Sequence, residues 1–267
     1  MVWTMPFRQR YLEILEGAYC AKDIMTLITG ACTCSKSDTP AEVHRQAEQG
    51  GYDLIPFIDG GQIAGFVERK ELESKMVEPI TSSVRPLTSK LIVSADTTFP
   101  ELLGVIQQNR FAFVNSSNDI VGLVTLADFN KRPVRILLFG LMMELELQML
   151  KCVKSKLSGE EARSVLDGDA IQVNDAYAQS KKDGVDVSWY DNLDLHRIME
   201  LFEGSARLRS LLKCTDAGQV RGEFGFLVDL RNRICHPENV LVRDAGELAY
   251  QWDRLTGAIQ LLDSAKA

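Results

Sequence analysis

Three side chains near the end of the sequence, Arg231, Asn232 and His236, place a guanidinium, an amide and an imidazole close together along the chain. A guanidinium offers a planar set of donors that fits phosphate oxygens, and an imidazole has an ordinary pKa of about 6.5. An imidazole can therefore give or take protons near neutral pH during cleavage of a phosphodiester. Since the chain has only 3 histidines, we interpret this segment as a candidate site for phosphate chemistry.

The segment around these side chains has the pattern of a helix end. Apolar residues recur at helical spacing over residues 222–235, and Pro237 cannot continue a helix, so His236 is expected at the C-terminus of that helix. The helix macrodipole favours a protonated imidazole there. Asn232 shares a face with His236, and Arg231 lies about 140° round the helix from His236. The helix would thus hold a proton donor and a phosphate ligand at one end.

Composition limits the partners of such a site. The chain has 267 residues, which favours two domains. Its 30 basic and 37 acidic side chains give a net charge of −7, which argues against non-specific coating of nucleic acid or of an anionic membrane. A selective RNA site is compatible with this charge, whereas DNA and membranes are not expected partners.

Cysteine spacing and apolar runs restrict the class further. The 6 cysteines form no CxxC pair and lie far from the histidines, which favours reduced thiols in a cytoplasmic protein and no bound metal. Cys32 and Cys34 are predicted to be buried small residues. The run from Ile136 to Met143 is much shorter than the roughly 20 residues that span a bilayer, so we predict a buried helix. Residues 1–19 are predicted to form an amphipathic helix rather than a signal peptide.

An internal repeat organises the first half of the chain. Residues 52–67 align with residues 110–124, so that Gly122 follows Gly65 by 57 positions. Each copy has apolar strands on both sides of a turn rich in Asp, Gly, Asn or Ser, which predicts a β-hairpin. A polar helix start precedes each hairpin, over residues 38–42 and 96–101, and a further helix start follows each at Glu68 and Thr125.

This order of strand, helix, strand, strand and helix resembles a tandem pair of CBS domains over residues 20–131, with copies at 20–79 and 80–131. The best match to the family is the segment from Gly122 to Asp128. The resemblance implies that the Thr125 hydroxyl and neighbouring amides hold the phosphate of an adenine nucleotide, that Asp128 accepts from ribose hydroxyls, and that Ala112 lies beside the base. The alternative is that Thr125 merely caps a helix and Asp128 complements its dipole.

The first copy departs from this motif. It has Glu68 and Glu71 at the positions of Thr125 and Asp128. Two carboxylates would repel a phosphate, so at most one competent nucleotide site is expected.

From Arg132 onward the apolar period is that of helices. Ser158, followed three residues later by Glu161, predicts a capping box and a helix start. His196 falls in an amphipathic helix with no partner for chemistry nearby, and is predicted to be structural. The expected helices cover residues 136–153, a segment from 158, 193–202, 222–235 and 245–265.

The pattern Arg231, Asn232, three residues and His236, late in a helical segment over residues 132–267, resembles HEPN domains. That family implies a small helical bundle and, in many members, a metal-independent ribonuclease whose composite site forms in a dimer. Arg231 would stabilise the phosphate, His236 would act as general acid or base, and Asn232 would orient the substrate, with Arg233 as a further contact. Other members pair or bind RNA without activity, and a helix end with Arg and His also suits a surface or a polar dimer seam.

The expected fold is therefore α+β: a tandem CBS module of βαββα repeats joined to an all-α, HEPN-like bundle. The expected function is an adenine-nucleotide-regulated, metal-independent ribonuclease that acts as a cytoplasmic homodimer on RNA. The alternative is a nucleotide-sensing dimeric adaptor without catalysis, so enzymatic activity stays open.

Overall fold

The computed structural model describes residues 14, 15, 17–236 and 238–264, and these fall into two compact units. The repeat unit comprises Glu16–Val134 with Val242–Gly246, and the helical unit comprises the remainder. Most of the amphipathic helix expected over residues 1–19, and the helix stop at Pro237, lie outside the described residues. Each unit is treated by itself.

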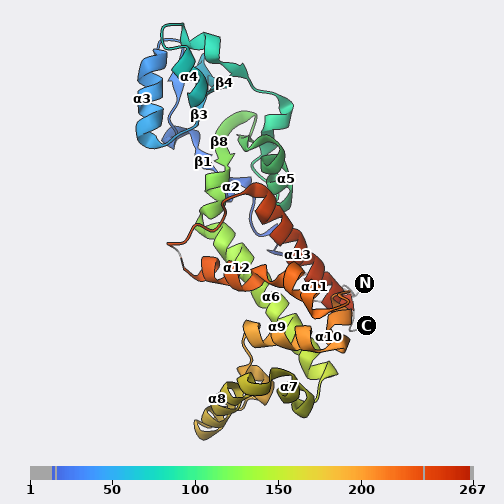
Figure 1. Cartoon of the computed structure of the whole chain (residues 1–267). Coiled ribbons are helices and arrows are strands. Elements are labelled where there is room, and N and C mark those ends of the chain that lie inside the picture. Colours follow the sequence, from blue (N-terminus) through green and yellow to red (C-terminus); the bar gives the residue numbers. More distant parts are fainter. Residues whose placement is uncertain (1–13, 16, 237, 265–267) are drawn as a thin grey trace. The chain divides into compact units, whose positions relative to one another are not determined.

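The repeat unit contains two four-stranded sheets with helices beside them (Figure 1). One sheet has the order β2, β3, β4, β5 and the other the order β1, β8, β7, β6. The strands are β1 (Thr26–Leu27), β2 (Cys34–Ser35), β3 (Leu54–Asp59), β4 (Gln62–Glu68), β5 (Arg85–Pro86), β6 (Ile92–Ser94), β7 (Phe111–Ser116) and β8 (Asp119–Thr125). The helices are α2 (Ala21–Ile24), η1 (Ile28–Gly30), α3 (Pro40–Gly50), α4 (Arg69–Ser74), η2 (Ile80–Ser83), η3 (Ser89–Leu91), α5 (Phe99–Asn109) and η4 (Leu126–Asn130).

Strand register confirms the internal repeat. In the first hairpin Phe57 pairs with Gly65, and in the second Val114 pairs with Gly122, so both partners shift by 57 positions. Each hairpin has its register irregularity directly after this pair. The turns also agree, because Gly60 and Gly61 have positive φ in one, and Ser117 and Asn118 in the other. The two copies therefore share one backbone plan.

The copies exchange short strands. β1, near the start of the first copy, pairs with β8 of the second, and β5, near the start of the second copy, pairs with β4 of the first. The exchanged segment passes directly over the repeated glycine in each case: a Cβ on Gly65 would lie 2.5 Å from the Arg85 carbonyl oxygen, and one on Gly122 would overlap Met25. Glycine is required at position 65 because the clash there is with backbone, whereas a side chain at position 122 would force the Met25 side chain to move.

Aromatic and aliphatic side chains bury the facing surfaces of the sheets. Phe66 of β4 packs in a T-shaped arrangement on Phe111 of β7, with ring centroids 5.0 Å apart, and it also contacts Phe113. Cys34 belongs to the buried core of the first copy, and Cys32 packs against that core. Burial raises the pKa of the Cys34 thiol to about 12, which agrees with the predicted role as a small apolar residue.

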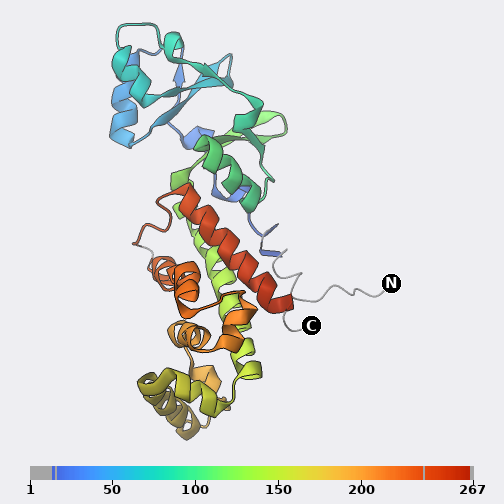
Figure 2. The same ribbon diagram turned by 45° about the vertical axis from the view of Figure 1, so that its right-hand side comes forward.

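The helical unit contains helices throughout its described residues, as the 3.6-residue period predicted. They are α6 (Arg132–Lys156), α7 (Gly159–Leu166), η5 (Asp167–Asp169), α8 (Ala170–Lys182), η6 (Trp189–Asn192), α9 (Leu195–Gly204), α10 (Ala206–Leu211), α11 (Ala217–Phe224), α12 (Phe226–Cys235) and α13 (Ala245–Ser264). The first turn of α6 belongs to the repeat unit. α13 runs alongside α6 in both views (Figures 1 and 2).

Helix boundaries follow local capping chemistry. Ser158 accepts from the Glu161 amide at 3.2 Å and Glu161 accepts from the Ser158 amide at 2.8 Å, which confirms the predicted capping box. The single helix expected over residues 222–235 is instead two helices that meet at Gly225. Glycine weakens a helix interior because it retains the most backbone freedom when unfolded, so the break falls there.

Candidate functional site

The predicted nucleotide residues Thr125 and Asp128 lie together at the start of η4. The Asp128 carboxylate is buried, and Oδ2 accepts from the Thr125 amide at 2.6 Å and from the Thr125 hydroxyl at 3.0 Å. Its other oxygen, Oδ1, accepts from the Thr26 hydroxyl at 2.9 Å and lies 2.7 Å from the Lys131 ammonium. Both oxygens therefore have protein partners, as expected if Thr125 caps the helix and Asp128 supports the cap.

This geometry changes what Asp128 can do for a ligand. A ribose hydroxyl would have to replace Thr26 or Lys131 at Oδ1, or add to the remaining lone pairs of the carboxylate. Lys131 also donates to the Ile24 and Met25 carbonyl oxygens, at 2.6 and 3.0 Å. The ammonium therefore keeps hydrogen-bond acceptors if a ligand displaces it from Asp128.

Ala112 occupies β7 opposite Val124 and is 0% exposed. The small side chain is covered by its neighbours in this conformation. An adenine would contact Ala112 only after an adjacent side chain moves, and the assignment of Ala112 to the base stays a prediction.

In the first copy, Arg85 of β5 binds Glu68 and Glu71, the residues that correspond to Thr125 and Asp128. Its guanidinium donates to Glu68 at 2.8 Å and also to Glu71. Lys70 lies 2.7 Å from Glu68 as well. These ion pairs neutralise the two carboxylates that the sequence places where the second copy has Thr125 and Asp128.

Arg231, Asn232 and His236 are all exposed on one side of the C-terminal half of α12. His236 is the C-cap, with its side chain 60% exposed and its Nδ1 atom 3.5 Å from Glu238. Within the described residues, the Arg231 side chain makes no hydrogen bond or ion pair. The guanidinium, amide and imidazole are therefore open to an external anion.

Arg233 is not part of this surface. Its side chain is only 10% exposed, its Nε atom lies 2.9 Å from Asp229, and it donates to Glu247 at 2.8 Å and to the Leu241 carbonyl oxygen at 2.9 Å. The expectation of a substrate contact from Arg233 is wrong, because two residues beyond Arg231 a helix has turned by about 200°. Arg233 ties α12 to α13 and to the loop between them.

Arg135 of α6 holds the end of α12. Its guanidinium donates to the carbonyl oxygens of Arg233, His236 and Asn239. These acceptors include carbonyl groups that a helix C-terminus leaves without intrahelical partners, and a cation there also complements the macrodipole. Arg135 thus positions the backbone of His236, a role that no spacing in the sequence indicates.

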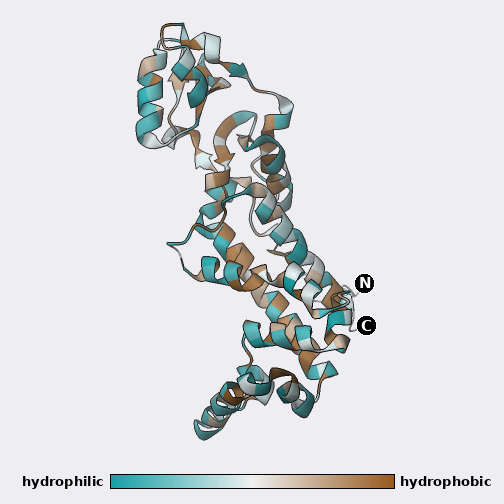
Figure 3. Ribbon diagram, viewed as in Figure 1, coloured by the Kyte–Doolittle hydropathy of each residue, from teal (hydrophilic) through white to brown (hydrophobic). Residues whose placement is uncertain are grey.

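The run from Ile136 to Met143 is helical, as predicted, but only one face of it is buried, and an exposed apolar stripe follows the other face of α6. Ile136, Phe139, Met143 and Leu147 are between 42% and 60% exposed. Their spacing of three, four and four residues places them on one face, and hydrophobic residues recur along this helix in Figure 3. α6 is apolar on two faces, and the described residues of its unit bury only one of them.

The stripe lies close to the phosphate-chemistry residues. Glu146, on the turn between Met143 and Leu147, is half-buried, and burial raises its pKa while the Arg231 guanidinium opposes that rise. Electrostatic coupling of this kind requires the two groups to be neighbours. Arg231 is therefore near Glu146, which directly precedes Leu147 of the stripe.

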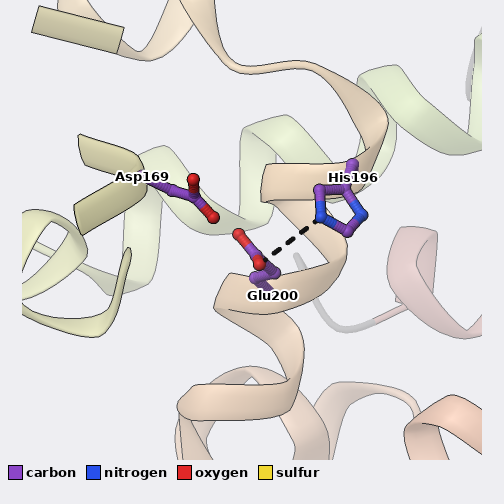
Figure 4. Close-up of side chains that lie close together, drawn as sticks. All are labelled: Asp169, His196 and Glu200. Carbon is purple, nitrogen blue, oxygen red and sulfur yellow. Dashed lines mark ion pairs between the residues drawn. The ribbon is translucent and has the colours of Figure 1, made fainter. Parts of the chain in front are cut away.

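His196 also differs from its prediction as a structural residue without partners. It is 65% exposed, and its Nε2 atom lies 3.5 Å from Glu200, one turn along α9. Asp169, at the end of η5, faces the same point (Figure 4). The sequence did not indicate this cluster because Asp169 lies 27 positions before His196.

None of the described helices combines the length and apolar composition needed to cross a bilayer. No model of a protein family matches the chain, and no curated protein matches its sequence.

The chain is similar to solved structures of proteins with CBS domains. A hemolysin-like protein containing a CBS domain from Oenococcus oeni is 17% identical, with 46% of this chain and 95% of that chain covered and a TM-score of 0.37. The CBS domain of a bacterial CNNM/CorC family Mg²⁺ transporter in complex with ATP is 19% identical, with 48% and 94% covered and a TM-score of 0.40. A putative acetoin utilization protein (AcuB) from Vibrio cholerae is 19% identical, with 47% and 96% covered and a TM-score of 0.40.

Proposed function

We propose that the chain is an adenine-nucleotide-responsive homodimer that cleaves RNA at a composite site formed by Arg231, Asn232 and His236 of two copies. The observation that carries the proposal is the shared exposure of these three side chains, while Arg233 between them is buried. Arg231 makes no hydrogen bond or ion pair with a described residue, and His236 has only an exposed contact with Glu238. Arg233 is used for packing, so the exposed pair suits a substrate anion rather than the fold.

The chemistry is transesterification within RNA. The ribose 2′-oxygen attacks the adjacent phosphorus and loses its proton to a base, and the bond from phosphorus to the 5′-oxygen breaks as an acid protonates that oxygen. The products are a 2′,3′-cyclic phosphate and a 5′-hydroxyl end. His236 gives or takes one of these protons, and Arg231 stabilises the negative charge on the pentavalent phosphate. One histidine cannot flank the scissile bond from both sides, and a twofold axis supplies the second.

The apolar stripe of α6 supports pairing of two copies. It extends over 11 residue steps, about 16 Å of helix, and ends beside Glu146. Burial raises the pKa of that carboxyl, and the nearby Arg231 guanidinium opposes the rise. Packing this face against its twin removes four large apolar side chains from water and brings the two Arg231 side chains toward one axis.

Pairing through this stripe predicts that Met143→Asp weakens self-association. A carboxylate introduced into an apolar contact loses its hydration without a partner, so the dimer dissociation constant should rise by about 10-fold or more. Sedimentation velocity over a range of concentrations measures it. Ile171→Asp, which alters an exposed apolar residue of α8, is the matched control. A monomeric wild-type chain, or equal effects of both variants, would contradict pairing through α6.

For the repeat unit we propose adenine nucleotide binding at Thr125 and Asp128. Support comes from the doubled backbone plan and from the resemblance of residues 122–128 to the CBS motif. Since ligand that binds only the folded state raises apparent stability, millimolar ATP or AMP should raise the melting temperature by a few degrees. Thr125→Val removes the hydroxyl and should reduce this rise.

Thr39→Val is the matched control for that measurement. Thr39 is also an N-cap whose hydroxyl bonds a carboxylate three residues later, Glu42 at 2.8 Å. The comparison concerns the nucleotide-induced shift, because both substitutions lower the baseline stability. An equal shift in both variants would remove Thr125 from the nucleotide site, and no shift in the wild type would reject nucleotide sensing.

The function as a whole is tested by incubating the protein with structured RNA in EDTA, with and without ATP or AMP, and mapping the RNA ends. Cyclic phosphate ends, with a rate that depends on the nucleotide, are the expected result.

A dimeric adaptor without catalysis is the second candidate. One observation favours it: Val228 and Cys235 are exposed on the same side of α12 as Arg231. Such a mixture of apolar and polar groups also suits a protein interface. Binding of RNA or a protein without cleavage would support this function instead.

A further inference from the structure

Asp169, His196 and Glu200 bring three metal-ligand atoms together in the helical unit. One oxygen of each carboxylate and one imidazole nitrogen all lie within 4.8 Å of one another. His196 and Glu200 are four residues apart on α9, which places them on one helix face. Asp169 approaches from the junction of η5 and α8, and the three side chains point toward one another (Figure 4).

The cluster has an unsatisfied acceptor at its centre. The Oε2 atom of Glu200 is buried and has no hydrogen-bond partner. Burial raises the pKa of Glu200, His196 opposes that rise, and the nearby Asp169 carboxylate adds to it. Two carboxylates face each other here with acceptor atoms only, and a buried acceptor without a partner is costly. A proton or a cation between them relieves both the repulsion and the missing contact.

Among the described residues, the cation of Arg197 does not fill this position. Arg197 donates to Asp194 at 2.5 Å and to Gln172, so its guanidinium is held by other groups. His196 offers a nitrogen that is a metal ligand when neutral. The donor set is thus one imidazole nitrogen and two carboxylate oxygens, with space on the exposed side of His196 for water.

We propose that Asp169, His196 and Glu200 bind a divalent transition metal ion, with Zn²⁺ as the best fit. Imidazole and carboxylate ligands suit this class of ion, and zinc accepts three protein ligands with a water as the fourth. Bond lengths of about 2.0 to 2.2 Å require the three side chains to close inward, which the exposed imidazole of His196 permits. The ion crosslinks α9 to the start of α8.

The proposal is tested by thermal denaturation of the full chain after EDTA treatment and desalting, with ZnCl₂ added back. A Cys235→Ser background removes the exposed thiol, which would otherwise compete for zinc. At about 100 times the dissociation constant the melting temperature should rise by roughly 5 to 10 °C. Calorimetric titration of the parent protein, which keeps His196, should give a stoichiometry of one zinc ion per chain.

Glu200→Gln gives the sharpest result. In metal-free protein this substitution removes one of two facing charges and should raise the melting temperature, whereas it should weaken zinc binding about 10-fold or more and abolish most of the zinc-induced rise. His196→Ala should also abolish most of the rise. His44→Ala is the matched control, because His44 pairs with Glu73 at 3.4 Å as a comparable histidine–glutamate contact.

A rise that persists in both Glu200→Gln and His196→Ala, or its absence in the parent protein, overturns the proposal. Loss of the rise in His44→Ala to the same extent overturns it as well. The measurement uses neither RNA nor nucleotide, so its outcome is separate from that of the proposed ribonuclease.

Discussion

Replacing His236 by Ala is expected to lower RNA cleavage by about 10²- to 10⁴-fold, the range that loss of a positioned acid or base produces. The imidazole lies at the C-terminal end of α12 and is exposed, so its removal leaves no buried group without a partner. Stability and self-association should therefore stay near wild type. Cleavage is measured from initial rates with structured RNA in EDTA.

Arg231→Lys separates charge from geometry at the same site. A lysine keeps the positive charge but lacks the planar fork that contacts two phosphate oxygens, so a loss of about 10²-fold is expected. His44→Ala in the repeat unit should cleave RNA at the wild-type rate. Equal cleavage by wild type and His236→Ala would reject catalysis at α12 and favour the adaptor.

The repeat could be predicted from the sequence because a period of 57 residues constrains every strand it covers. Once Gly65 aligns with Gly122, the hairpin register follows, and the structure has the same pairing in both copies. The exchange of β1 and β5 between the sheets was not predictable in this way. Both strands are only two residues long, and so short a segment has no periodicity of its own.

The candidate site was predicted in part. Spacing identified Arg231, Asn232 and His236, because the pitch of a helix is enough to predict that these residues lie on one side of it. It did not separate them from Arg233, because the burial of Arg233 depends on Glu247 and the Leu241 carbonyl, which come from later in the chain. The support of His236 by Arg135 has the same origin: a contact over 101 positions depends on tertiary packing.

The apolar pattern of α6 was ambiguous for a physical reason. A helix with apolar residues on two faces is equally compatible with full burial and with an exposed contact face, since period alone does not say what covers each face. The cluster of Asp169, His196 and Glu200 could not be predicted from the sequence for a related reason. Only two of its members share a helix, and the third is brought there by packing of η5.

Asp128→Ala is expected to lower the free energy of unfolding of the repeat unit by about 3 kcal/mol, whatever its effect on nucleotides. The buried carboxylate has four contacts, and its loss leaves the Thr125 amide and the Lys131 ammonium without their strongest acceptor. Hydrogen bonds to charged groups contribute about 1.5 to 3 kcal/mol each, although Lys131 keeps three further acceptors that limit the loss. Urea denaturation measures the effect.

Asp119→Ala provides the control on the same strand, since Asp119 is exposed at the start of β8 and should change the unfolding free energy by less than about 0.5 kcal/mol. A loss below about 1 kcal/mol in Asp128→Ala would show that water or a rearranged Lys131 replaces the carboxylate. The expected large loss has a consequence for nucleotide binding. A lower melting temperature in Asp128→Ala cannot by itself report a missing ribose contact, so the shift that nucleotide adds to each variant must be compared. Thr125→Val, which keeps the Asp128 cap on the Thr125 amide, is the variant that separates ligand binding from folding.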